Sequence, residues 1–99
     1  MIVVRNVFQV KFAKMKDAVA LWKEGHSLAK KSGGVRDIRI LTDVTGPAYT
    51  LAVELTYESL ADYERDGRAL MSTPEWASWY QKVVPLMESS RREIYTIVG

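Results

Sequence analysis

The chain has 99 residues, of which 47% are hydrophobic and 26% charged, a composition that predicts a globular protein and argues against disordered, collagen-like and membrane proteins. The net charge is only +2, with acids and bases interspersed from end to end, so nucleic acid is not expected as a partner. The absence of cysteine excludes disulfides, thiolate metal sites and a cysteine nucleophile.

The first half of the chain predicts a strand, a helix and a hairpin. Ile2 to Val10 is rich in β-branched and aromatic residues, which favours a strand. From Met15 to Lys31 apolar residues recur every three or four positions, which predicts an amphipathic helix that ends at the glycines of Ser32-Gly33-Gly34. Strands are expected at Val35 to Val44 and Ala48 to Tyr57, joined by a turn.

The second half predicts two helices and a last strand. Ser59 followed by Asp62 resembles a capping box, which predicts a helix from Leu60 to about Leu70. Thr73-Pro74-Glu75 gives a second start signal for a helix to about Met87, which Pro85 should kink or end early. Alternation from Arg92 to Val98 indicates a fourth strand.

This order predicts an α+β, ferredoxin-like βαββαβ domain spanning residues 1–99. Right-handed crossovers and short connections leave a four-stranded antiparallel sheet with helices on one face as the simplest topology. The opposite face should carry charges of both signs, among them Arg5, Asp37, Arg39 and Glu54. Such a face suits packing against a second copy of the chain, and a monomer with a solvated face is the alternative.

The sequence resembles the dimeric α/β-barrel superfamily, which includes antibiotic-biosynthesis-type monooxygenases, NIPSNAP proteins and stress-responsive barrel proteins. The segments that carry the resemblance are Val10 to Lys14, Ala20 to Trp22, Thr56 to Tyr63, Ser72 to Trp76 and Arg92 to Tyr95. The resemblance implies two sheets packed face to face in a homodimer, with a ligand cavity between sheet and helices in each subunit. Its members include cofactor-free oxygenases, haem enzymes and proteins of no known activity.

Haem-degrading members of the superfamily use an asparagine on the first strand, a tryptophan and an axial histidine. Asn6 and Trp76 match the first two, but Trp79-Tyr80-Gln81 stands where the histidine is expected. Haem degradation is therefore not expected, and one histidine without any cysteine argues against a transition-metal site, so no cofactor is predicted. The N-terminal apolar stretch is too short for a signal peptide and no segment is long enough to span a membrane, so a cytoplasmic protein is expected.

Two polar residues are candidates for catalysis. His26, the only histidine, falls on the apolar stripe of the first helix with Met15, Val19 and Trp22. It is a candidate general base, haem ligand or substrate donor, and a histidine of the core is the alternative. Asn6 falls on the expected helix-facing side of the first strand, where a buried amide needs hydrogen-bond partners.

Five aromatic residues are candidates for the wall of a pocket for a flat ligand: Trp22, Tyr63, Trp76, Trp79 and Tyr80. Each of them alone also fits a core or dimer-contact role. The sequence thus predicts a small-molecule-binding homodimer, with monooxygenase-like activity on a hydrophobic or aromatic substrate. The alternative is a non-catalytic ligand-binding or protein-interaction module, whose aromatic residues fill the space that an enzyme leaves open.

Overall fold

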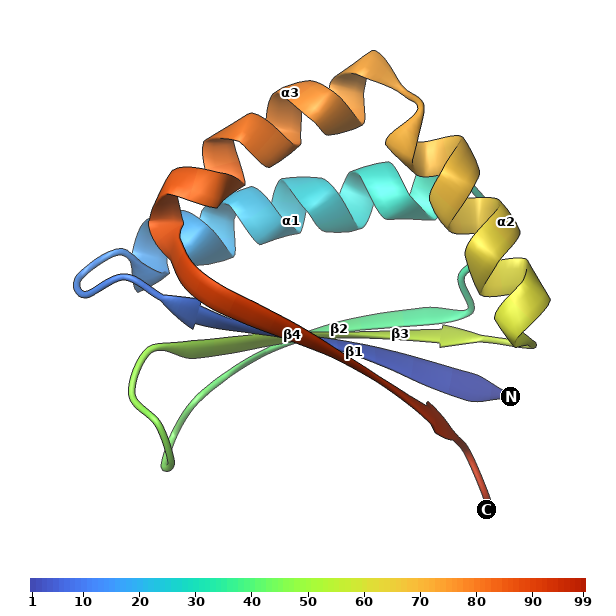
Figure 1. Cartoon of the computed structure of the whole chain (residues 1–99), viewed down its shortest axis with the longest axis horizontal. Coiled ribbons are helices and arrows are strands. Elements are labelled where there is room, and N and C mark those ends of the chain that lie inside the picture. Colours follow the sequence, from blue (N-terminus) through green and yellow to red (C-terminus); the bar gives the residue numbers. More distant parts are fainter.

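Four antiparallel strands form one sheet in the computed structural model, which describes residues 1–99 (Figure 1). The strand order across the sheet is β2-β3-β1-β4, so β2 and β4 are the edge strands. The strands are β1 (Ile2–Val10), β2 (Asp37–Thr42), β3 (Thr50–Tyr57) and β4 (Met87–Thr96). The predicted ferredoxin-like βαββαβ order is therefore confirmed.

All three helices cover the same face of the sheet (Figure 1). They are α1 (Met15–Lys31), α2 (Leu60–Met71) and α3 (Pro74–Val83). Helix α3 packs along α1, whereas α2 lies across one end of the sheet. None of the helices is long and apolar enough to cross a bilayer.

The predicted helix boundaries rest on caps that the structure contains. The hydroxyl of Ser59 accepts from the amide of Asp62, and that of Thr73 accepts from the amide of Trp76, which satisfies a free donor at the start of α2 and of α3. After α1, Gly33 has a φ of 83°, a left-handed conformation that glycine adopts without steric cost.

The predicted boundary between the last helix and the last strand is wrong. Helix α3 ends at Val83, a short 3-10 turn (η1) covers Val84–Leu86, and β4 begins at Met87 rather than Arg92. Pro85 has no N–H for a helical hydrogen bond, so the chain leaves the helix there. The segment after it has little strand propensity of its own, but it pairs with β1 over its whole length. Pairing with a neighbouring strand thus overrides the local sequence preference.

The sheet packs its core against α1 and α3. Buried side chains on the helix-facing side of the strands include Val10, Ile38, Leu51 and Val53, and those of the helices include Ala18, Trp22, Ala29, Trp79 and Val83. Gly25 lets α1 and α3 approach closely, because a Cβ at this position would lie 2.5 Å from a ring carbon of Trp79. The indole of Trp79 therefore occupies the space that a side chain at position 25 would take.

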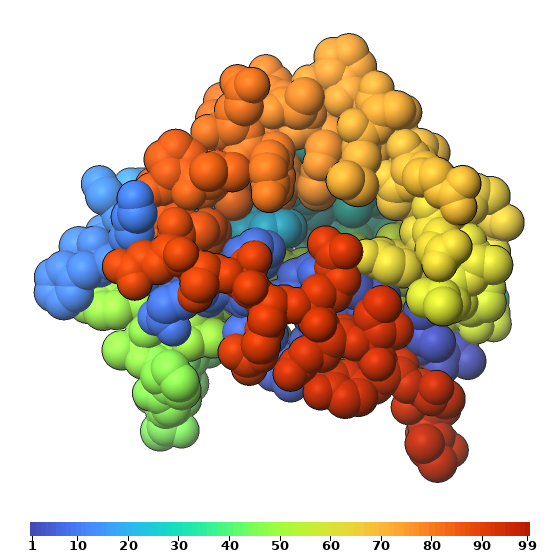
Figure 2. Space-filling view, in the orientation of Figure 1, coloured from blue at the N-terminus to red at the C-terminus, as the bar shows by residue number.

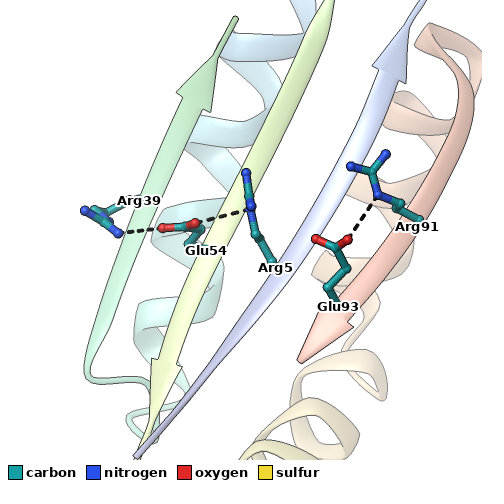
Figure 3. A network of polar contacts seen from close by, with 5 residues as sticks. All are labelled: Arg5, Arg39, Glu54, Arg91 and Glu93. Carbon is teal, nitrogen blue, oxygen red and sulfur yellow. Dashed lines mark hydrogen bonds and ion pairs between the residues drawn. The ribbon is translucent and has the colours of Figure 1, made fainter. Parts of the chain in front are cut away.

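The opposite face of the sheet carries ion pairs, as the sequence predicts (Figure 3). The carboxylate of Glu54 on β3 bridges Arg5 at 3.3 Å and Arg39 at 2.6 Å, and Arg91 pairs with Glu93 at 3.4 Å on β4. These pairs alternate with small or apolar positions such as Val7 and Ala52.

Candidate functional site

A cavity of about 260 Å³ lies between the sheet and the helices. In Figure 2 the surface is hollowed between α3, in orange, and β4, in red, with α1 in teal at the back of the hollow. The cavity is lined mainly by aromatic and aliphatic side chains: Phe8, Trp22, Ala29, Ile38, Ile40, Val53, Leu55, Tyr57, Leu70, Trp76 and Tyr80. Its volume is slightly below the roughly 300–1,000 Å³ of sites for drug-sized ligands, so it suits a small flat molecule.

Five of the seven predicted site residues line this cavity. Asn6 and His26 both do so, together with Trp22, Trp76 and Tyr80. The 3.6-residue period of α1 places His26 one turn after Trp22 on the same face, and the two-residue period of β1 places Asn6 beside Phe8. The side chains of Asn6 and His26 are half-buried. The structure thus brings the two polar candidates and an aromatic wall to one cavity.

Trp79 and Tyr63 do not line the cavity. Trp79 is 3% exposed, its indole N–H donates to the backbone carbonyl of Leu21, and its ring centroid lies 4.7 Å from that of Trp22 and 4.6 Å from that of Trp76. The ring of Tyr63 meets that of Tyr57 edge-on at 5.4 Å. Both residues therefore support aromatic side chains that line the cavity.

The sequence-based prediction missed the cavity residues from β4. Ser90, Arg91 and Arg92 line the cavity, because β4 runs along its mouth. Ser90 and Arg91 lie before the predicted start of this strand, and Arg92 lies at that start. The Nε of Arg92 donates to Oδ1 of Asn6 at 2.9 Å, across the β1–β4 pairing in which the two residues are partners. Strand pairing of this kind connects residues far apart in the chain, and no local pattern in the sequence indicates it.

Tyr57 is a further lining residue that sequence reasoning did not single out. Its phenol donates to Oδ2 of Asp66 at 3.2 Å, and the hydroxyl of Ser32 lies 2.8 Å from the same oxygen. Asp66 is the one buried acid of the chain, 8% exposed. Burial and then the charge of Asp66 raise the pKa of the Tyr57 phenol above its ordinary value. The carboxylate of Asp66 in the middle of α2 thus links the end of α1, through Ser32, to the end of β3, through Tyr57.

No group of three or more His, Cys, Asp or Glu side chains is placed to hold a metal ion. The chemistry that the cavity offers on its own comes from an imidazole, a carboxamide, two guanidinium groups, two phenols and a serine hydroxyl around an apolar interior. These groups bind, orient and move protons on a ligand; they do not themselves accept electrons.

Comparison with known proteins identifies the family. The NIPSNAP family model matches residues 4–99, almost the whole chain. The chain belongs to the NIPSNAP family. The resemblance predicted from the short sequence segments is therefore confirmed. No match was found among curated proteins.

Solved structures with the same fold support this placement. An uncharacterized NIPSNAP domain protein from Burkholderia xenovorans superposes with a TM-score of 0.90 at 15% identity, over 100% of this chain and 96% of the other. A protein from Nitrosomonas europaea, named as a candidate antibiotic biosynthesis monooxygenase, gives 0.80 at 20% identity over 100% of both chains. SnoaB, a cofactor-independent oxygenase from Streptomyces nogalater, gives 0.79 at 11% identity, over 99% of this chain and 93% of the other.

At these identities the likeness concerns the fold. This NIPSNAP protein shares the dimeric α/β-barrel fold with monooxygenases and with family members of no assigned activity, and proteins of this fold are typically dimers.

Proposed function

We propose that this NIPSNAP-family protein is a homodimer that binds a small hydrophobic or aromatic molecule beneath its helices and oxygenates it without a cofactor. The observation that carries the proposal is the cavity itself, in which His26 and Asn6 meet an aromatic wall. The fold shared with a protein named as a cofactor-independent oxygenase supports it. The ligand class follows from the lining, because aromatic and aliphatic side chains favour a flat, largely apolar molecule.

Oxygenation without a cofactor requires a substrate that supplies the electrons itself. A methylene group between aromatic rings that are conjugated with a carbonyl loses a proton to a base, and the resulting carbanion is electron-rich enough to react with dioxygen. In the balanced reaction the methylene group and one dioxygen molecule give a carbonyl group and one water. Both C–H bonds of the methylene group and the O–O bond break, a C=O bond forms, and the two hydrogens leave in the water. In this proposal His26 accepts the first proton, and Asn6 orients the carbonyl oxygen of the substrate through a hydrogen bond.

The dimer part of the proposal rests on the open face of the sheet. Leu41 on β2 and Tyr95 on β4 are exposed there, at 39% and 51%, on either side of the ion pairs of Glu54. A two-fold axis requires only a self-complementary patch, and a face with both charges and apolar side chains meets that requirement. Sedimentation at micromolar concentration should give twice the mass of one chain, and Leu41→Glu should shift the mass toward that of the monomer.

A non-catalytic ligand-binding or protein-interaction module is the second candidate. The observation that favours it is the packing of the aromatic side chains on one another: Trp22 and Trp76 contact Trp79 in the core as well as lining the cavity. In that case the same cavity binds a ligand, and His26 has no role in turnover.

Turnover of anthrone separates the two candidates, because anthrone has an activated methylene group and its product anthraquinone is measured by absorbance. The protein should raise the rate of anthraquinone formation above the rate in buffer. One molecule of dioxygen should be consumed for each molecule of anthraquinone formed. His26→Gln keeps the size and polarity of the side chain but removes the base, and it should lower turnover roughly 100-fold or more. Ser27→Ala, at the exposed neighbouring position of α1, is the matched control and should leave the rate unchanged.

Binding is measured separately through tryptophan fluorescence, because two of the three tryptophans, Trp22 and Trp76, line the cavity. Full turnover in His26→Gln would refute the role of His26. Anthrone that quenches the fluorescence but is not oxidised faster than in buffer would support the second candidate.

A further inference from the structure

The charged residues that line the cavity are all cationic. Two arginines, Arg91 and Arg92, line the cavity, and no aspartate or glutamate does. The carboxylate of Asp66 lies behind Tyr57 and is engaged by the hydroxyls of Tyr57 and Ser32. A largely apolar cavity therefore has a cationic rim without a protein anion facing it.

Arg92 is the arginine whose charge the chain does not neutralise. Every other arginine forms an ion pair with a carboxylate, and Arg91 does so with Glu93 on the open face (Figure 3). Arg92 instead donates through Nε to the neutral carboxamide of Asn6. This bond holds the guanidinium at the cavity and leaves its two terminal nitrogens as donors. A planar pair of donors of this kind matches the two oxygens of a carboxylate.

The position of Arg92 in the sheet fits a ligand that enters from the side of β4. β4 is an edge strand, and Ser90 and Arg92 are alternate residues on its helix-facing side, paired with Phe8 and Asn6. Both line the cavity at the hollow seen in Figure 2. A hydroxyl and a guanidinium thus lie at the mouth, while the aromatic and aliphatic side chains lie inside.

We propose that the ligand of this cavity is an aromatic acid, whose ring system lies among the apolar side chains and whose carboxylate binds the guanidinium of Arg92 at the mouth. The proposal deepens the proposed function and rests on it, since it assumes that the cavity binds a small molecule. It adds a substrate class and an anion-binding residue. Asn6 then has a positioning role as well, because its Oδ1 orients the guanidinium.

A pair of probes equal in shape but different in charge tests the proposal. 2-Naphthoate and 2-naphthamide have the same ring system, and both are titrated into the protein while tryptophan fluorescence is recorded. The wild type should bind naphthoate roughly tenfold or more tightly than naphthamide, the usual scale of a charge-assisted hydrogen bond. The preference should weaken as salt is raised, because the site is at the surface.

Three variants locate the effect. Arg92→Gln should make the two affinities equal, by loss of naphthoate binding alone. Arg91→Gln is the matched rim control, since Arg91 is already paired with Glu93, and it should keep most of the preference. Asn6→Asp is nearly isosteric and gives Arg92 a carboxylate partner, so it should also abolish the preference although Arg92 is intact.

The outcomes are distinguishable. If neither probe binds the wild type, the proposed ligand-binding function fails. If both bind with equal affinity, the cavity binds ligands but the anion site is refuted. If Arg91→Gln abolishes the preference as completely as Arg92→Gln, the assignment to Arg92 is wrong. The wild-type comparison needs no variant, so it decides whether the cavity has an anion site even if Arg92→Gln does not fold, and Asn6→Asp then tests the assignment to Arg92.

Discussion

Gly25 offers the sharpest test of how this structure is packed. It lies in the middle of α1, where alanine is normally better than glycine by about 1 kcal/mol. A Cβ here would lie 2.5 Å from Cζ2 of Trp79, and the indole has no room to move. Its N–H is bonded to Leu21, and its ring is held between Trp22 and Trp76. Overpacking of this kind costs about 1–3 kcal/mol, so Gly25→Ala should destabilise the protein or leave its stability unchanged.

Gly67 is the control that the chain itself provides. It also lies inside a helix, α2, but no atom lies within 4 Å of a Cβ built at that position. Gly67→Ala should therefore stabilise the protein by the full propensity gain of about 1 kcal/mol, which in a domain of this size raises the Tm by about 4–8 °C. The difference in unfolding free energy between the two variants, measured in urea, isolates the overpacking term. Equal stabilisation by both substitutions would refute the packing described for Gly25.

The remaining predictions concern the hydrogen bonds of Asp66. Asp66→Ala leaves the buried phenol of Tyr57 without its acceptor and removes one of the two acceptors near the Ser32 hydroxyl, so the free energy of unfolding should fall by about 1–3 kcal/mol in a urea titration. An unchanged midpoint would contradict the network. The pKa of Tyr57 is raised above its ordinary value of 10.0, so its contribution to stability is complete below about pH 10 and is lost as the pH rises further. Between pH 10 and 11 the wild type should lose up to about 1.4 kcal/mol more than Tyr57→Phe, and parallel curves for the two proteins would exclude this cause.

The sequence was sufficient for the architecture wherever a local signal marks an element. The period of α1, the β-branched and aromatic composition of β1 and the hydroxyl caps at Ser59 and Thr73 act within a few residues, and the structure contains the helix, the strand and both caps. The same periods place Asn6 and His26 on the faces that meet at the cavity. These predictions held because helical and strand geometry alone decides which side chains share a face.

Local sequence patterns did not predict which aromatic residues of α3 line the cavity and which lie in the core. Trp76, Trp79 and Tyr80 are within one turn or so of one another, and the helical period groups all three on one side. The crossing of α3 over α1 sends Trp79 into the core and leaves Trp76 and Tyr80 at the cavity, and that crossing depends on the missing side chain of Gly25. Such a distinction requires the tertiary contact and is not contained in the helix alone.

The placement of Arg92 at the mouth of the cavity also depends on a tertiary contact, in this case the pairing of β4 with β1. Pro85 ends the helical run, so the chain turns into β4 at Met87 and pairs with β1 along its whole length. The pairing shifts in register between Gln9 and Val10, and beyond that irregularity Ser90 and Arg92 face the helices. A shift of one residue would exchange Arg92 for its neighbours and turn its guanidinium to the ion-paired open face. The position of one proline and one irregularity in strand pairing thus decides whether the cavity has a free cation, which is why the anion site proposed here was not visible in the sequence.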